Sequence, residues 1–156
     1  MKDKNGEHPL GDGGQLILFV FFLLIWVGDS FILKLSTFLS DDIPLYIRLP
    51  VLGLLLATAV YLIRSGHVVV KHEQRPSGIV STGAFRYVRH PLYLGSVMFY
   101  FGLAVATASL ASFALVVVIF LFYNHIASYE EKLLEEHFNE AYRTYKNRTG
   151  KWLPNL

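Results

Sequence analysis

The sequence predicts an all-α integral membrane protein with about four transmembrane helices and a cytosolic amphipathic C-terminal helix. Hydrophobic residues make up 53% of the 156 residues and the mean hydropathy is +0.42. Apolar residues make up only about 45–50% of ordinary soluble domains. In addition, no charged residue occurs between Phe99 and Phe122. A hairpin buried inside a soluble protein is the alternative, and this long uncharged stretch argues against it.

Four apolar segments define the predicted spanning elements. They cover residues 14–39, 44–63, 92–107 and 110–127. A helix needs about 20 residues, with a usual range of about 17–25, to cross a bilayer, and the first two segments reach this length on their own. The last two are short and are separated only by Ala108 and Ser109. They are therefore predicted to form a tight helical hairpin.

The first segment has a signal peptide as its alternative interpretation. Its apolar stretch continues past the roughly 7–15 residues expected of a signal-peptide core, and no small-residue cleavage site follows. We therefore expect residues 31–39 to continue the helix. Asp29 lies inside this span, and we expect it to bond to a neighbouring helix rather than to act in a site.

The distribution of basic residues predicts the orientation of the chain. Residues 64–90 and the tail from residue 128 each hold five of the 14 Lys and Arg residues, whereas the connection at Asp41 and Asp42 is acidic. Basic segments remain on the cytoplasmic side, so both termini and the long loop are predicted to be cytosolic. The resulting single membrane domain comprises an N-terminal segment (1–13), two spanning helices (14–63), a basic loop (64–91), a helical hairpin (92–127) and a cytosolic lid helix with a tail (128–156).

The tail has the pattern of an amphipathic helix. Its apolar residues recur at the spacing of one helix face, and they are Leu134, Phe138, Ala141, Tyr142 and Tyr145. We expect this helix to continue the fourth span into the cytosol and to lie over the basic loop as a lid. The alternative is a solvated surface helix in which Glu130 and Glu131 are ordinary charges.

Two polar motifs flank the predicted hairpin. Arg86, Arg89 and His90 precede its first helix, and Glu130 and Glu131 follow its second. Charge beside a membrane segment is costly unless it meets water, lipid headgroups or a ligand. The arrangement therefore indicates a polar cofactor held at the membrane surface. No pattern typical of a metal or nucleic-acid site is present, and the chain has no cysteine.

The two motifs resemble those of a known family. The run Gly83-Ala84-Phe85-Arg86-Tyr87-Val88-Arg89-His90-Pro91-Leu92-Tyr93-Leu94-Gly95 is similar to the signature of the isoprenylcysteine carboxyl methyltransferase family, which belongs with the phospholipid methyltransferases. Glu130-Glu131, followed by Phe138, Tyr142, Tyr145 and Pro154, is similar to its second motif. Ala84, Phe85 and Asn139 depart from the usual residues. The resemblance covers residues 79–154, about half of the chain.

The resemblance implies S-adenosylmethionine as the cofactor. It also implies cofactor contacts by Tyr87, His90, Pro91, Tyr93, Leu94, Gly95, Glu130 and Glu131. A carboxylate accepts charged hydrogen bonds from an ammonium, and a guanidinium binds a carboxylate through two parallel bonds. Arg89 and Arg143 are the candidate catalytic residues, the first for the cofactor or the reaction centre and the second for closing the lid.

The predicted function is methyl transfer to a lipophilic, isoprenylcysteine-like carboxylate that enters from the bilayer, with membrane lipids as the other partners. Phospholipid amines and small thiols are alternative acceptors. A reductase of the membrane sterol type that uses NADPH is a second class, and a non-enzymatic membrane adaptor is a third.

Overall fold

The computed structural model describes residues 11–72 and 78–155, and it confirms the all-α class. Its elements are α1 (Gly11–Val27), a π-helix (Gly28–Leu33), α2 (Leu39–Asp42), α3 (Leu45–His72), a 3-10 turn (Gly83–Arg86), α4 (Pro91–Thr107), α5 (Leu110–Phe138) and α6 (Glu140–Arg148). The described residues form no β-strand, and Val88 and Gly150 make one isolated parallel bridge.

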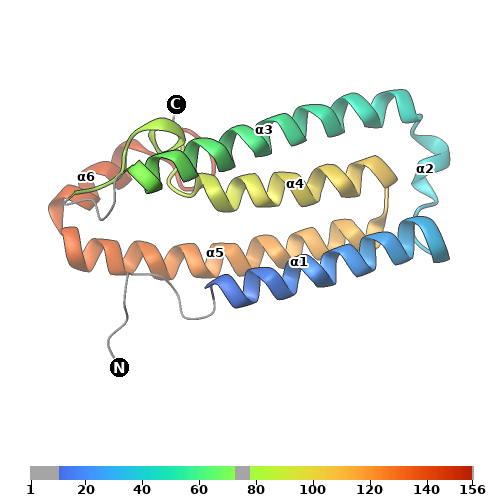
Figure 1. Cartoon of the computed structure of the whole chain (residues 1–156), viewed down its shortest axis with the longest axis horizontal. Helices are drawn as coiled ribbons and strands as arrows, with labels where there is room; N and C mark the ends of the chain where they lie inside the picture. Colours follow the sequence, from blue (N-terminus) through green and yellow to red (C-terminus); the bar gives the residue numbers. More distant parts are fainter. Residues whose placement is uncertain (1–10, 73–77, 156) are drawn as a thin grey trace.

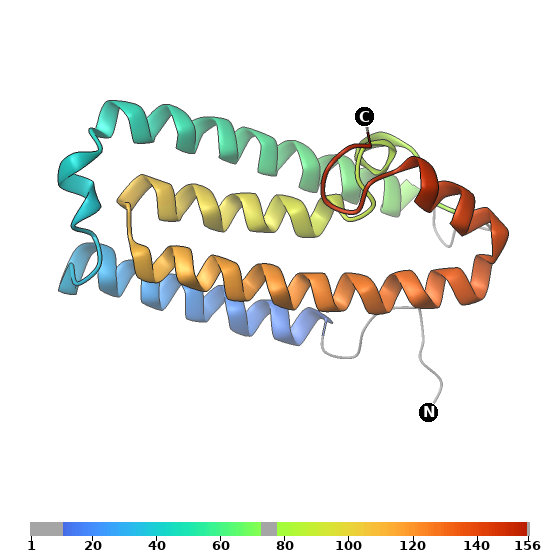
Figure 2. The ribbon, with the colours of Figure 1, turned by 180° about the vertical axis from the view of Figure 1, so that it is seen from behind.

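The long helices run side by side in an elongated bundle. α3 packs along α4, α4 and α5 form a hairpin, and α1 lies along α5 (Figure 1). The view from behind shows α6, the segment before α4 and the C-terminal segment gathered at one end of the bundle (Figure 2). α2 and the turn between α4 and α5 lie at the opposite end. We call these the site end and the far end.

The chain is an integral membrane protein by the length and apolar character of its helices. Among the described residues, Gly13–Leu33, Leu45–Val68 and Leu110–Phe138 are long and apolar enough to cross a membrane. The fourth apolar helix, Pro91–Thr107, has 17 residues, which is the lower end of the usual range. Large apolar side chains on α1 and α3, such as Leu16, Leu24 and Leu54, are exposed, as expected of surfaces that face lipid.

The prediction that residues 31–39 continue the first helix is wrong. The helix ends at Leu33, and Lys34 adopts a left-handed conformation with φ of 52°. The physical cause is Asp29. Its buried carboxylate accepts hydrogen bonds from the Ser36 backbone N–H (2.9 Å), the Ser36 hydroxyl (2.5 Å) and the Ser109 hydroxyl (2.5 Å). The chain turns back at Lys34 to place Ser36 there. The expected bond from Asp29 to a neighbouring helix is confirmed, because Ser109 caps α5.

The predicted hairpin is confirmed. α4 ends at Thr107, Ala108 takes a left-handed conformation, and Ser109 caps α5 by accepting from the Ser112 N–H. Trp26 of α1 donates its indole N–H to the Leu103 carbonyl near this turn. The buried core between these three helices consists of Phe22, Tyr100, Ala104, Val116, Ile119 and Tyr123.

The observed ends of α3 and α5 lie beyond the ends predicted from the sequence. α3 continues to His72, which is well into the predicted basic loop. α5 continues to Phe138, where Asn139 (φ 48°) breaks the helix, and α6 then folds back over the segment before α4. Tyr142 of α6 is buried, and the Tyr145 hydroxyl donates to the Phe85 carbonyl at 2.7 Å. The helix predicted to lie over this segment does so, as a separate element.

Candidate functional site

The two predicted motifs meet at the site end of the bundle. Arg89 and His90 directly precede α4, where Pro91 occupies the first turn and needs no hydrogen-bond partner for a backbone N–H. Glu130 and Glu131 lie on the part of α5 that extends past the core. Tyr93 lies in the first turn of α4. We call these five residues, Arg89, His90, Tyr93, Glu130 and Glu131, the polar cluster.

Glu131 is the centre of the polar cluster. Its Oε1 accepts from Arg89 Nε at 2.9 Å and lies 3.0 Å from His90 Nε2. The residue is 7% exposed. A buried carboxylate without such partners would be costly, so Arg89 and His90 account for its ionised form. Through these two contacts Glu131 connects α5 to the residues at the start of α4.

Arg89 also fastens the C-terminal segment. Its Nη1 donates to the backbone carbonyls of Lys146 (3.1 Å) and Thr149, and its backbone N–H donates to the Gly150 carbonyl at 2.9 Å. Among the described residues, Nη2 makes no hydrogen bond. Arg89 therefore connects the start of α4, α5 and the C-terminal segment. The two N–H groups of Nη2 remain as donors for a ligand.

His90 is held in its neutral form. Burial of the ring lowers the pKa of His90; Glu131 opposes this shift, and the nearby cations Lys151 and Arg89 reinforce it. A neutral ring that faces the Glu131 carboxylate carries its proton on Nε2. Nδ1 is then an acceptor, and it lies 3.9 Å from Glu130 Oε2. Two acceptor atoms thus face each other, which is an arrangement suited to a positively charged donor between them.

Aromatic rings form one wall of the polar cluster. Tyr93 stacks on His90 with ring centroids 5.8 Å apart and on Tyr123 with centroids 5.1 Å apart. The Tyr93 hydroxyl donates to Glu130 Oε1 at 2.6 Å. This bond fixes Glu130 beside His90. The Glu130 side chain is 18% exposed, twice the 9% of Glu131, so Glu130 is the more accessible carboxylate.

The C-terminal segment closes another side of the polar cluster, which the sequence did not predict. Trp152 packs against His90 and Phe120 and donates its indole N–H to Asn124 Oδ1 at 3.0 Å. Lys151 Nζ donates to the Asn124 carbonyl and the Ser128 hydroxyl. No spacing in the sequence relates Trp152 to Asn124. A tryptophan near a chain end otherwise indicates only a membrane interface.

The remaining predicted cofactor residues lie around the polar cluster with different roles. Pro91 is buried, Leu94 is half-buried and Tyr87 is 51% exposed. Gly95 faces α3 instead: a Cβ atom there would lie 2.7 Å from Ile63 Cγ1 and 3.1 Å from the Ala59 carbonyl oxygen. The glycine is therefore required for the close approach of α4 to α3.

Arg143 is not brought into the polar cluster. It lies on the outer side of α6, where it pairs with Glu135 of α5 at 3.0 Å and with Glu140 at 2.8 Å. Its side chain is 55% exposed. This position agrees with a role in holding α6 to α5, and it places Arg143 away from the atoms that Arg89 and His90 contact.

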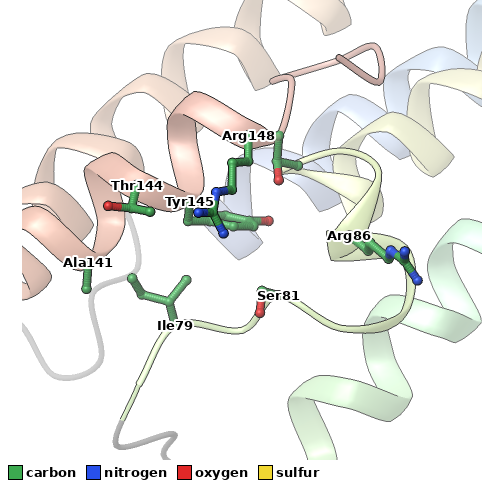
Figure 3. Close-up of a pocket in the computed structure, with 8 residues that line it drawn as sticks. Ile79, Ser81, Arg86, Ala141, Thr144, Tyr145 and Arg148 are labelled. Atoms are coloured by element: carbon green, nitrogen blue, oxygen red, sulfur yellow. The ribbon is translucent and has the colours of Figure 1, made fainter. Parts of the chain in front are cut away.

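A pocket of about 590 Å³ opens between α6 and the segment before α4 (Figure 3). Its size is within the range of about 300–1,000 Å³ for small-molecule sites. It adjoins the polar cluster through Thr149, whose carbonyl accepts from Arg89. Its lining residues are Ile79, Ser81, Arg86, Ala141, Thr144, Tyr145, Arg148 and Thr149. No group of three or more metal-ligating side chains is found in the described part of the chain.

Comparison with known proteins gives several relatives. The chain is 33% identical to protein-S-isoprenylcysteine O-methyltransferase of Saccharomyces cerevisiae over 91 residues, which is 56% of this chain and 37% of that protein. It is 33% identical to methanethiol S-methyltransferase 1 of Bradyrhizobium diazoefficiens over 90 residues, 58% of this chain and 30% of that protein. With methanethiol S-methyltransferase of Pseudomonas deceptionensis the identity is 36% over 72 residues, 46% of this chain and 27% of that protein.

The matched region thus spans only about a third of the length of these relatives. No solved structure matches the chain. The phospholipid methyltransferase family matches residues 49–141, which is more than half of the chain and includes both halves of the polar cluster. The chain belongs to the phospholipid methyltransferase family.

Proposed function

We propose that the protein transfers a methyl group from S-adenosylmethionine to a lipophilic acceptor at the cytosolic surface of the membrane. The observation that carries this proposal is the polar cluster, in which Glu130 and Glu131 of α5 meet Arg89 and His90 at the start of α4. Membership of a methyltransferase family and relatives named as methyltransferases support the reaction type.

The residues present fit this cofactor. S-adenosylmethionine supplies an activated methyl group on a sulfonium, and its methionine end carries an ammonium and a carboxylate. Glu130 Oε2 and His90 Nδ1 are the paired acceptors for the ammonium. Arg89 Nη2 is the donor for the carboxylate. The rings of Tyr93 and Trp152 contact His90 and border the polar cluster. Aromatic faces attract cations, so these rings suit the sulfonium of the cofactor.

The two carboxylates have different roles in this proposal. Glu131 is occupied by Arg89 and His90, so it orients the residues that bind the cofactor. Glu130 is more exposed and binds the ammonium directly. Adjacent residues of a helix point about 100° apart, and His90 lies between the two directions, with Nε2 toward Glu131 and Nδ1 toward Glu130.

The acceptor is an isoprenylcysteine-like carboxylate, which the relative from Saccharomyces cerevisiae supports by its name. A carboxylate that approaches a sulfonium must be oriented and largely freed of water. A guanidinium orients such a group without giving up a proton. Arg89 Nη2 has two N–H groups, so we assign one to the acceptor carboxylate and one to the carboxylate of the cofactor. Arg143, through Glu135, keeps α6 closed over the site. A small thiol is the second candidate acceptor, favoured by the two relatives named methanethiol S-methyltransferases.

The proposed orientation rests on residues 64–90 and 128–156, which hold ten of the 14 Lys and Arg residues and whose described parts include the segment before α4 and α6 at the site end. Because basic segments remain on the cytoplasmic side, we propose that this end, with both termini and the polar cluster, is cytosolic. A polar cofactor then enters from water, and a lipophilic acceptor enters laterally from the bilayer beside α4 and α5.

A labelled-methyl transfer assay with the purified full-length protein tests the reaction and the acceptor together. The panel contains a prenylated cysteine carboxylate, a phospholipid amine, a quinone-like lipid and methanethiol. We expect label on the prenylated carboxylate, and much less of it with Glu130→Gln protein at the same cofactor concentration. Label on methanethiol alone would favour the second acceptor. Absence of label on every acceptor, with folded protein, would contradict the proposal.

A further inference from the structure

The pocket at the site end differs in charge from the polar cluster. Among the described residues, its lining includes Arg86 and Arg148 and no acidic side chain. Neither arginine side chain makes a hydrogen bond or an ion pair among the described residues. The polar cluster, by contrast, contributes two carboxylates. S-adenosylmethionine carries a sulfonium cation and an ammonium, so its positive groups suit the carboxylates of the polar cluster. The basic lining of the pocket suits an anion.

The two arginines are placed differently. Figure 3 shows the Arg148 side chain directed from the end of α6 toward the space above Ser81, whereas Arg86 lies at the opposite side and points outward. Tyr145 is fixed by its hydrogen bond to the Phe85 carbonyl. Arg148 is therefore the residue for a direct contact inside the pocket. Arg86 adds positive potential at its edge.

The pocket lies near the end of a helix that is long and apolar enough to cross a membrane. The segment that forms its lower wall is tied to α3, because the Ala84 N–H donates to the Ser65 hydroxyl at 2.9 Å. Ser65 is in the last turn of the apolar span that runs to Val68. The lipid headgroups of a bilayer begin where its hydrocarbon core, and hence an apolar span, ends. Ile79 and Ala141 add apolar surface for the glycerol region of a lipid, and the Ser81 and Thr144 hydroxyls add hydrogen-bond donors.

From these observations we infer that the pocket binds the phosphate of an anionic phospholipid, at a site separate from the one that holds the methyl donor. Arg148 contacts the phosphate, Ser81 and Thr144 donate to it, and Arg86 attracts it. The lipid would thus join α6 to the segment before α4 and hold the lid over the polar cluster. This site does not require the lipid to be the methyl acceptor.

The test measures the stability of full-length protein in a neutral detergent as phosphatidylglycerol or phosphatidylcholine is added. We expect phosphatidylglycerol to raise Tm and phosphatidylcholine to have little effect. Arg148→Gln should weaken the apparent lipid affinity about fivefold, the effect of one basic residue at a membrane surface. Arg148→Lys should retain part of the response, because it keeps the charge but loses the planar guanidinium. Arg86→Gln should lose a smaller part of the lipid response. High salt should abolish this difference from the wild type, because it screens the attraction of an exposed charge.

Lys132→Gln is the matched control, since Lys132 is an exposed cation of α5 outside the pocket. An equal loss in this control, or a full response in Arg148→Gln, would overturn the inference. If inorganic phosphate alone stabilises the wild-type protein as strongly as the lipid does, the assignment to lipid is wrong. In detergent without added lipid, binding of S-adenosylhomocysteine should be unchanged in Arg148→Gln protein. Glu130→Gln protein should keep its lipid response. Failure of the proposed cofactor site can therefore be distinguished from failure of the lipid site.

Discussion

Arg89 donates from Nε to Glu131 Oε1 across 2.9 Å, and this bond joins two residues that are 42 positions apart in the chain. The same guanidinium reaches the carbonyls of Lys146 and Thr149. One side chain thus connects the start of α4, the extended part of α5 and the C-terminal segment. The site depends on this connection because His90, Glu130 and Trp152 are each carried by a different one of these segments.

Arg89→Lys should lower both stability and methyl transfer. Lysine keeps the charge, but its single nitrogen cannot replace bonds from Nε and Nη1 to three acceptors. Loss of charged hydrogen bonds costs about 1.5–3 kcal/mol each, so we expect a lower Tm and weaker binding of S-adenosylhomocysteine, with membrane insertion unchanged. Thermal unfolding and calorimetry on the same preparation provide the measurement. Near-normal turnover by this variant would remove Arg89 from the site.

Binding of S-adenosylhomocysteine should depend on pH through His90. Burial lowers the pKa of His90, and the proposed ammonium contact requires the neutral ring. Affinity should therefore be constant from about pH 7 to pH 8 and fall only at acidic pH, once the pH drops through the lowered pKa of the folded protein. The limiting slope for one proton is about tenfold per pH unit. Unfolded His90 has the higher pKa, so stability falls in the same direction. His90→Gln protein should lack the step, and an unchanged pH profile in this variant would assign the step to another group.

Trp152 should report on ligand binding. The chain has two tryptophans, so Trp26→Phe leaves Trp152 as the single fluorophore. Its ring contacts His90 and its N–H bonds Asn124. We expect S-adenosylhomocysteine to change the Trp152 emission, and Asn124→Ala to shift the emission of the free protein and reduce stability by about 0.5–1.5 kcal/mol. If saturating ligand leaves the emission spectrum unaltered, Trp152 does not lie at the binding site.

Asp29 should matter for stability and not for cofactor binding. It lies near the far end and accepts three hydrogen bonds that hold the turn after α1 against the start of α5. Asp29→Asn removes the charge from these bonds, and we expect a loss of about 1.5–3 kcal/mol with unchanged affinity for S-adenosylhomocysteine. Asp41→Asn is the control, because Asp41 is exposed at the same end of the molecule. Equal Tm values for the two variants would show that the buried bonds contribute little.

The sequence predicted those features that depend on local pattern. The α4–α5 hairpin follows from two uncharged segments separated by Ala108 and Ser109, and the approach of the two motifs follows from the hairpin itself. Asp29 was correctly expected to bond to a neighbouring helix. In each case the relevant information lies in hydropathy and spacing along the chain.

Features set by tertiary contacts were not predictable in this way. The turn at Lys34 depends on Ser36 and Ser109 meeting one carboxylate, and the local sequence favours continuing the helix. The role of Gly95 depends on the approach of Ile63 from α3. Trp152 reaches His90 only because α6 folds back at Asn139. These relations join residues distant in sequence, and no periodicity records them.

Calorimetric titration of S-adenosylhomocysteine into wild-type and Glu130→Gln protein tests the central claim most directly. The claim is that Glu130 and His90 Nδ1, 3.9 Å apart, hold the ammonium of the methyl donor. We predict micromolar affinity for the wild type, near about −8 kcal/mol. Loss of a charged hydrogen bond should weaken binding in Glu130→Gln protein by about 1.5–3 kcal/mol, with Tm preserved. Absence of both heat and thermal shift for folded wild-type protein, or identical affinity in the two proteins, would contradict the account.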